Sequence, residues 1–379
     1  MPKDVADSQA RSVEMRPKRK PPEVQIVGSP AYDLLLSLYI AFSQRNADFE
    51  LDPQWWVTQA HEKCSPELLA TLSLFFGDEE ESQWCAGRLC TLLWRSPAPH
   101  SISATLDWLA QLPPEDVLTV LLDRDGLGDD WYDTALELIR AHSGKKGGKN
   151  EPSKSVQAFA RRYPSGERAA VIRFLTAPNA EQERLINALR EWHALVFAQE
   201  EDRVTAAVTR EAAAVQKRAA ELSPAELFAS VVKGIEFDLP AATERLVLAP
   251  SALIAPTVFH FHWGETTTYC YPIPDVPRTA SDSIAIQRRE MVRLFEALAD
   301  DTRLRILRHL AERQMYLTEL SEHLKLTKAT TRHHMVRLRS AGLVTVHIRE
   351  HLSYYSLRRE TLDEPTRLLL RYLGLTSSQ

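Results

Sequence analysis

The sequence predicts a mainly helical protein with small β elements, in which an N-terminal helical part with short strands precedes a C-terminal domain of helices and a hairpin. Three observations support this fold class. Apolar residues recur at three-to-four spacing over most of the first 240 residues. Short β-branched and aromatic runs follow, separated by Pro or Gly. The last hundred residues combine both patterns, and a length of 379 residues allows two or three domains.

The composition is typical of a soluble globular protein, with 44% hydrophobic and 26% charged residues. No apolar run reaches the roughly 18 residues needed to span a bilayer. The polar, basic N-terminus lacks the apolar segment of a secretory signal. Four cysteines in a chain of this length do not suggest a disulfide scaffold. We therefore expect a cytoplasmic protein without a membrane partner.

The charge is unevenly distributed. The whole chain carries a net charge of -5, but residues 284–379 hold 17 Lys and Arg against 11 Asp and Glu, a net of +6. Residues 1–283 must then carry -11. A basic C-terminal module on an acidic remainder predicts that the module faces phosphates and that the rest faces something else.

Residues 1–22 hold six Lys or Arg and four Pro, and we expect a disordered basic tail that is either simply solvated or an arm that touches DNA. A helical subdomain is predicted for residues 23–143. Its helices begin at Ser29-Pro30 and Ser65-Pro66, where Ser is the N-cap and Pro the first helical residue, and include residues 101–112 and 130–142.

A Gly- and Lys-rich loop at residues 144–152 separates this part from a second subdomain, predicted for residues 153–274. The second subdomain begins with a long helix from about Ala180 to Glu221, whose second half has a weak apolar stripe that indicates either shallow packing or a connector. Ser223 opens a capping box. Residues 244–274 predict short strands in a small sheet or hairpin, and Asp275 to Asp282 predict a linker.

Residues 284–379 predict a fourth unit, with four helices before a hairpin. An amphipathic helix at Gln287–Ala299 precedes a second helix capped by Asp300 and Asp301. Thr318 is expected to cap the third helix and Thr327 the fourth, which ends at Gly342. The third and fourth helices, joined by Lys325-Leu326, form a helix-turn-helix.

Alternation from Val344 to Ile348 and a second run at residues 353–357 predict a hairpin, whose polar turn would form a wing. The last helix, Leu362 to Leu373, carries more apolar residues than a solvent-facing helix needs. We therefore expect a winged helix-turn-helix whose last helix forms the seam of a homodimer.

Several motifs in this unit resemble the ArsR-type winged-helix regulators. The resemblance rests on Leu298-Ala299-Asp300-Asp301-Thr302-Arg303-Leu304-Arg305-Ile306-Leu307, on Thr318-Glu319-Leu320, on Arg332-His333-His334-Met335 with Leu338 to Val344, and on Tyr354-Tyr355-Ser356-Leu357. It covers about a quarter of the chain and implies a DNA-binding transcriptional regulator. Residues before it are similar to the helical domain that precedes the winged helix in some longer ArsR-like regulators, through Ser29-Pro30 and Val247 to Ser251, which implies no particular ligand.

The chain departs from the metal-sensing members of that family. Those members carry cysteines in the third helix, where this chain has Gln314-Met315-Tyr316-Leu317, or His and Asp on the last helix, which here has no His. Without thiolate or imidazole ligands in these places, a Zn or arsenic site of those types is not expected. We predict no metal and no cofactor.

The fourth helix has an outer face that suits the major groove. On a helical wheel Thr331, His334, Met335 and Leu338 point inward, and His334 is expected to be packed and hydrogen-bonded. Arginine can contact guanine bidentately, and Thr and Lys can reach bases or phosphates. The alternative is an ordinary solvated basic face. With two residues of the wing, the predicted DNA-binding residues are Lys328, Thr330, Arg332, His333, Arg337, Arg349 and His351.

Two other groups of residues allow a different interpretation. His260 and His262 share one face of a strand and Cys270 lies on the next, which could begin a metal site, although a half-buried strand explains the pattern equally well. Trp55, Trp56, Trp84, Trp94 and Trp108 could line a ligand pocket or form an aromatic core. We find no phosphate loop, nucleophile elbow or acid pair and predict that the protein is not an enzyme.

The sequence therefore predicts a transcriptional regulator, expected to be a repressor, that binds double-stranded DNA as a homodimer. Its N-terminal part would sense an unknown small-molecule effector or hold the dimer together. The alternative is a winged-helix assembly module for proteins, which does not bind DNA sequence-specifically. Its docking helix would expose apolar groups rather than Lys328, Arg332 and Arg337.

Overall fold

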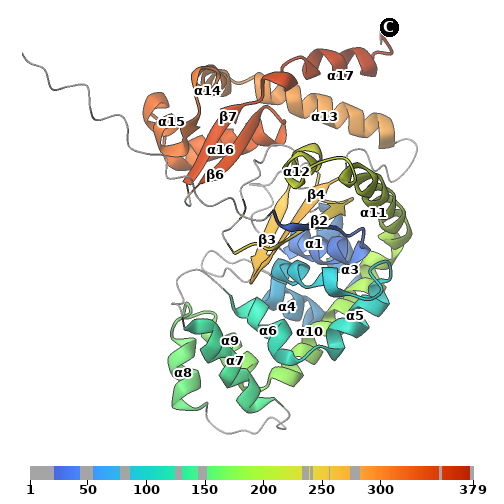
Figure 1. The fold of residues 1–379 in the computed structure, drawn as a ribbon, viewed down its shortest axis with the longest axis vertical. Coiled ribbons are helices and arrows are strands. Elements are labelled where there is room, and N and C mark those ends of the chain that lie inside the picture. Colours follow the sequence, from blue (N-terminus) through green and yellow to red (C-terminus); the bar gives the residue numbers. More distant parts are fainter. Residues whose placement is uncertain are drawn as a thin grey trace, which may run out of the picture.

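The computed structural model describes residues 21–42, 54–76, 86–123, 130–143, 152–232, 239, 242–255, 257–273, 282–349 and 352–375. We call residues 21–273 the body and residues 282–375 the winged-helix domain (Figure 1). The mainly helical fold with a few short strands is confirmed. Within the described ranges, no helix combines the length and the apolar character that crossing a bilayer requires.

The body is built mainly from helices. Its predicted Ser caps are confirmed, because Ser29 Oγ accepts a hydrogen bond from Ala31 N, Ser65 Oγ from Leu68 N, and Ser223 forms a capping box with Glu226. Short 3₁₀ segments lie at Ala86–Thr91 and Leu93–Arg95. The helices are α1 (Pro30–Phe42), α3 (Gln54–Lys63), α4 (Pro66–Phe76), α5 (Ile102–Gln111), α6 (Pro114–Leu122), α7 (Trp131–His142), α8 (Lys154–Ala160), α9 (Arg168–Thr176), α10 (Pro178–Trp192), α11 (Ala198–Ala219) and α12 (Pro224–Val231).

A four-stranded sheet crosses the body. The strands are β1 (Glu23–Ile26), β2 (Arg245–Ser251), β3 (Phe259–Trp263) and β4 (Thr266–Pro272), in the order β1-β2-β4-β3. The strands expected within residues 244–274 are confirmed. Strand β1 was not predicted, and it pairs in parallel with β2, as β2 does with β4, whereas β3 and β4 form an antiparallel hairpin.

Buried side chains from both predicted subdomains share one core. Residues between Ala31 and Ile139 and residues between Val156 and Ile273 belong to the same apolar cluster. The loop expected at residues 144–152 lies, apart from Pro152, outside the described residues. Trp56 packs against Trp192 and Phe197 in this cluster, at ring-centroid distances of 6.4 and 6.0 Å, and is core rather than pocket lining. Trp84 lies outside the described residues.

The long helix predicted from Ala180 to Glu221 is formed by α10, a π-helical segment at His193–Phe197, and α11. The second half is packed and is not an exposed connector, since Val204, Val208, Ala212 and Val215 are all buried. The apolar stripe of this half is weak in the sequence because small residues on α11 let its backbone lie close to the neighbouring segment at Gly28. A Cβ on Gly28 would lie only 2.7 Å from both Ala212 Cβ and the Val208 carbonyl oxygen.

The winged-helix domain follows the predicted order of elements around its own apolar core. Strands β6 and β7 form the expected hairpin, and β5, which was not predicted, adds a third antiparallel strand in the order β5-β7-β6. The elements are α13 (Asp282–Leu298), α14 (Asp301–Glu312), β5 (Met315–Tyr316), α15 (Leu317–Leu324), α16 (Lys328–Ser340), β6 (Val344–Arg349), β7 (Leu352–Leu357), a 3₁₀ turn (Arg359–Thr361) and α17 (Glu364–Tyr372).

Local capping rules predicted three helix ends in this domain correctly and a fourth wrongly. Asp300 Oδ1 accepts a hydrogen bond of 2.9 Å from Arg303 N, and Thr327 Oγ1 accepts one of 3.1 Å from Thr330 N. Gly342 has a φ of 72° after α16, as a C′ residue does. The cap at Thr318 was wrong, because α15 begins at Leu317 and the Glu319 carboxylate instead accepts from Tyr316 N at 2.8 Å.

Candidate nucleic-acid interface

The turn between α15 and α16 sets the direction of the second helix. Lys325 adopts a left-handed conformation with a φ of 57°, and Leu326 N donates to the Ser321 carbonyl at 2.9 Å. Leu320 and Leu324 of α15 are buried in the same cluster as Met335 and Leu338 of α16. The two helices therefore form the predicted helix-turn-helix, held by a shared apolar seam.

The inner face of α16 consists of the residues that the helical wheel assigned to it. Thr331, Met335 and Leu338 are buried. The Thr331 hydroxyl donates to the Thr327 carbonyl at 3.0 Å, so that its polar group is satisfied within the helix. This packing fixes the rotation of α16 about its axis and thereby decides which side chains face solvent.

The outer face of α16 is exposed and basic. All five side chains predicted to contact DNA from this helix are exposed, as the wheel predicted, although exposure alone does not test the contact. The Thr330 hydroxyl also lies 2.8 Å from the Thr327 hydroxyl, so it takes part in the helix cap. Guanidinium and ammonium groups on one exposed helix face can bind guanine edges and phosphates. The five exposed side chains of α16 that are predicted to contact DNA are Lys328, Thr330, Arg332, His333 and Arg337.

The two predicted wing residues are less fully described. Arg349 is the last residue of β6 and pairs in register with Leu352, at the tip of the hairpin. Its side chain is outside the described part of the structure, and His351 lies outside the described residues altogether. Contacts of the wing with DNA stay a prediction.

His334 is packed as predicted, but the hydrogen bond expected for it is not formed by its Nδ1 atom within the described residues. Its side chain is 14% exposed and its Nδ1 atom lies 3.7 Å from Asp300 Oδ1, beyond hydrogen-bond range. Among the described residues, Nδ1 finds no hydrogen-bond partner. Burial lowers the pKa of His334, and the nearby Asp300 carboxylate partly opposes this shift. The neutral imidazole is therefore favoured at this position.

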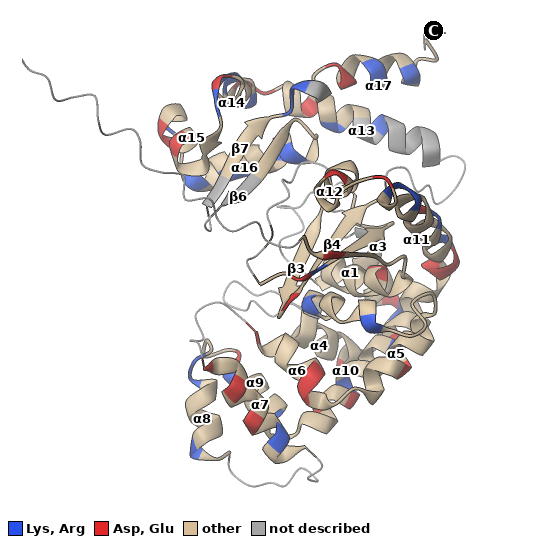
Figure 2. Cartoon of the chain, viewed as in Figure 1, with Lys and Arg blue, Asp and Glu red and all other residues tan. Residues whose placement is uncertain are grey.

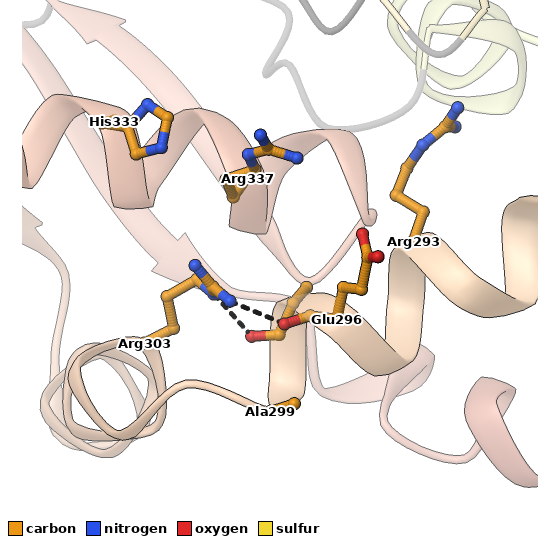
Figure 3. A pocket seen from close by; sticks show the side chains of 7 residues that line it. Arg293, Glu296, Ala299, Arg303, His333 and Arg337 are labelled. Carbon is orange, nitrogen blue, oxygen red and sulfur yellow. Dashed lines mark hydrogen bonds between the residues drawn. The ribbon is translucent and has the colours of Figure 1, made fainter.

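Two further arginines lie beside the predicted face. Arg293 of α13 and Arg303 of α14 line a cavity of about 330 Å³ together with Glu296 and with His333 and Arg337 of α16 (Figure 3). Periodicity within single helices could not find this cavity, because only the packing of three helices brings these side chains together.

The basic and acidic parts of the sequence correspond to the winged-helix domain and to the body, respectively. Lys and Arg are spread over α13, α14 and α17 as well as over α16 (Figure 2). The basic C-terminal segment counted from the sequence is the winged-helix domain, so the positive charge belongs to the unit that contains the exposed face of α16.

The hairpin of the body does not assemble the suggested metal ligands. His260 pairs with Tyr269, whereas Cys270 pairs with Phe259. Directly paired residues share a face of an antiparallel sheet, so Cys270 lies on the face opposite to both His260 and His262. His262 Nδ1 is instead 2.9 Å from the Thr267 hydroxyl. In the described part of the chain, no group of three or more His, Cys, Asp or Glu side chains could hold a metal ion.

The fold and the basic face together define a winged helix-turn-helix domain of the DNA-binding class. Residues 300–346 match the family described as bacterial regulatory protein, arsR family. Over 84 residues the chain is 29% identical to the transcriptional repressor SdpR of Bacillus subtilis (strain 168), a match that covers 22% of this chain and 93% of that protein. No solved structure matches the chain significantly.

The C-terminal domain is thus an ArsR-type helix-turn-helix domain. These matches support a DNA-binding transcriptional regulator. The family match lies within the winged-helix domain, at residues 300–346, and the match to the repressor spans 22% of the chain.

Proposed function

We propose that this protein is a homodimeric transcriptional repressor that reads operator DNA with the exposed face of α16. The observation that carries the proposal is the exposure of Lys328, Arg332 and Arg337 on a helix whose opposite face is buried in the domain core. Repression is proposed because the similar protein from Bacillus subtilis is named a transcriptional repressor.

Base reading is assigned to Arg332 first. It lies in the N-terminal half of α16, the part of a recognition helix that approaches base edges most closely. Lys328, Thr330, His333 and Arg337 are assigned to neighbouring bases and phosphates, and Arg349 and His351 of the wing to the phosphate track beyond them.

The dimer is proposed to form through α13 and α17, which pack along each other at one side of the domain (Figure 1). Large apolar side chains on this pair of helices are exposed, with Val292 at 42% and Tyr372 at 39%, and Leu373, directly after α17, is 55% exposed. Such a patch on an isolated domain marks an interaction surface. A two-fold axis beside it would present two α16 helices to half-sites about one helical turn apart.

The body is proposed to sense a signal or to support the dimer. Its core is separate from that of the winged-helix domain, and its sequence is acidic where the domain is basic. An acidic body does not compete with the winged helix for phosphates, which leaves it available for a small-molecule effector.

The assembly-module alternative predicts apolar groups on the outer face of α16. Within the described residues, the exposed large hydrophobic side chains of this domain lie on α13, α14 and α17 and in the segments next to α17, and none lies on α16. The chemistry of α16 therefore favours nucleic acid over a protein partner.

Selection of bound duplexes from a random pool tests this function. The wild-type protein should enrich one sequence with two related half-sites. Arg332→Ala should lose the preference at one base position of each half-site, because a bidentate arginine contact contributes about 1–3 kcal/mol of discrimination. Arg308→Gln, which removes an exposed arginine of α14, should enrich the same sequence as the wild type. Enrichment no greater than from an unselected pool would overturn the proposal.

A further inference from the structure

The cavity between α13, α14 and α16 gathers positive charge from three separate helices. Arg293 comes from the last third of α13, Arg303 from the first turn of α14, and His333 and Arg337 from successive turns of α16 (Figure 3). The single carboxylate that lines the cavity belongs to Glu296. The side chains of three arginines and one histidine thus line one space together with one acid.

Arg303 is held in place by the end of α13. Its Nε donates to the Ala297 carbonyl at 2.8 Å and its Nη2 to the Glu296 carbonyl at 2.6 Å, and its Nη1 lies 3.8 Å from Asp300 Oδ2. These contacts satisfy carbonyls at the C-terminus of α13 and fix the guanidinium at the edge of the cavity. Its charge therefore helps to keep the cavity positive, although Asp300 offsets part of it.

We infer that this cavity binds a phosphate group. Guanidinium groups bind phosphate oxygens through charge-assisted and often bidentate hydrogen bonds, and several of them converging on one space suit a group with three or four oxygens. Phosphate has two sources here, a phosphate of the DNA backbone or a free phosphate ion. The first source rests on the proposed DNA-binding function; the second does not.

The position of the cavity favours a backbone phosphate. His333 and Arg337 belong both to the cavity and to the exposed face of α16, so a duplex lying along α16 brings its sugar-phosphate strand to the mouth of the cavity. Arg293 would then extend the contact from α16 to α13. Phosphate contacts of this kind fix the position of a protein on the duplex without reading sequence.

The experiment compares wild type with Arg293→Gln and with Arg308→Gln as the matched control. Arg293 is half-buried on α13, whereas Arg308 is an exposed arginine of α14 that does not line the cavity. In the first arm, affinity for an unselected duplex is measured at 0.05 to 0.3 M salt. In the second arm, the midpoint of thermal unfolding is measured without DNA, in inorganic phosphate and in chloride at equal ionic strength. The chloride midpoints also report whether each variant is folded.

If DNA supplies the phosphate, Arg293→Gln weakens binding about fivefold near 0.15 M salt and reduces the slope of log affinity against log salt by about 0.9 for each cavity engaged. The Arg308→Gln variant keeps the wild-type slope. If a free ion is the source, phosphate raises the unfolding midpoint of the wild type and of Arg308→Gln but not of Arg293→Gln, with salt slopes unchanged. Equal behaviour of Arg293→Gln and Arg308→Gln in both arms would overturn the inference. Failure of the protein to bind any duplex would contradict the proposed function but would leave the phosphate arm decisive for the cavity.

Discussion

Asp33 carries a carboxyl group that is buried between the first turn of α1 and the end of β2. Its Oδ1 atom accepts hydrogen bonds from Ser251 Oγ at 2.5 Å and from Ala252 N at 3.1 Å. Burial nevertheless dominates and raises the pKa of Asp33 to about 7, despite these bonds and the nearby Arg203. The folded body therefore holds a proton that the unfolded chain releases near pH 4.

This carboxyl group makes the stability of the body depend on pH. Because the folded state binds more protons than the unfolded state between about pH 4 and pH 7, the free energy of unfolding falls as pH rises through that window. Asp33→Asn keeps an acceptor for Ser251 and cannot ionise, so it should abolish this fall, which is at most about 4 kcal/mol for a shift of roughly three pKa units. Urea unfolding at pH 4.5 and 7.5 measures the difference, with the exposed Asp133→Asn as control. The same pH dependence in Asp33→Asn and wild type would contradict the assignment.

Gly28 shows how an element is positioned by close approach. It precedes α1 and lies against α11, where an added Cβ would be 2.7 Å from a backbone oxygen of Val208 as well as from Ala212 Cβ. Backbone cannot move away as a flexible side chain could. The small side chains on α11 and the absence of one at residue 28 together let α11 pack close to the start of α1.

Gly28→Ala should therefore destabilise the body by about 1–3 kcal/mol through overpacking. Gly166→Ala is the matched control, because nothing lies within 4 Å of a Cβ at that position. The midpoint of urea unfolding checks both. If the two substitutions have the same effect, the close approach does not determine the packing of α11.

Elements whose signals are local could be predicted from the sequence. Ser29, Ser223, Thr327 and Gly342 mark helix ends because capping depends on atoms only a few residues apart. Strand β1 could not be predicted in the same way. It is four residues long, and its partner β2 lies more than 200 residues further along the chain, so no periodicity joins them.

The candidate nucleic-acid interface shows the same limit of prediction from local sequence patterns. The exposed face of α16 followed from the wheel of one helix, whereas Arg293 and Arg303 belong to the cavity only because α13 and α14 pack beside α16. Two details of this domain also differed from the prediction, one through a local capping bond and one through a tertiary contact. Glu319 begins α15 by binding Tyr316 N instead of leaving Thr318 as the cap, and His334 faces Asp300 at a distance too long for a hydrogen bond.

The proposed reading of two half-sites requires two copies of the chain. The exposed apolar side chains of α13, α17 and the residue that follows α17 predict that Leu369→Glu combined with Leu373→Glu converts a dimer to a monomer, because each protomer would bury two charges in the seam. Arg371→Glu places an acidic side chain at an exposed position of α17 on the side opposite to Leu369 and Leu373 and should leave the dimer intact. Sedimentation equilibrium measures the mass. A wild-type mass of 43.0 kDa at micromolar concentration would contradict the dimer.

The exposed basic face of α16 is proposed to read DNA sequence. The most direct measurement is the ratio of affinities for the selected duplex and for a scrambled duplex of the same composition, both at 0.15 M salt. A specific regulator should prefer its site by about a thousandfold or more. Arg332→Ala should lower this ratio by about ten- to a hundredfold, while its binding to scrambled DNA changes little. A ratio near one for the wild-type protein would contradict sequence reading by α16.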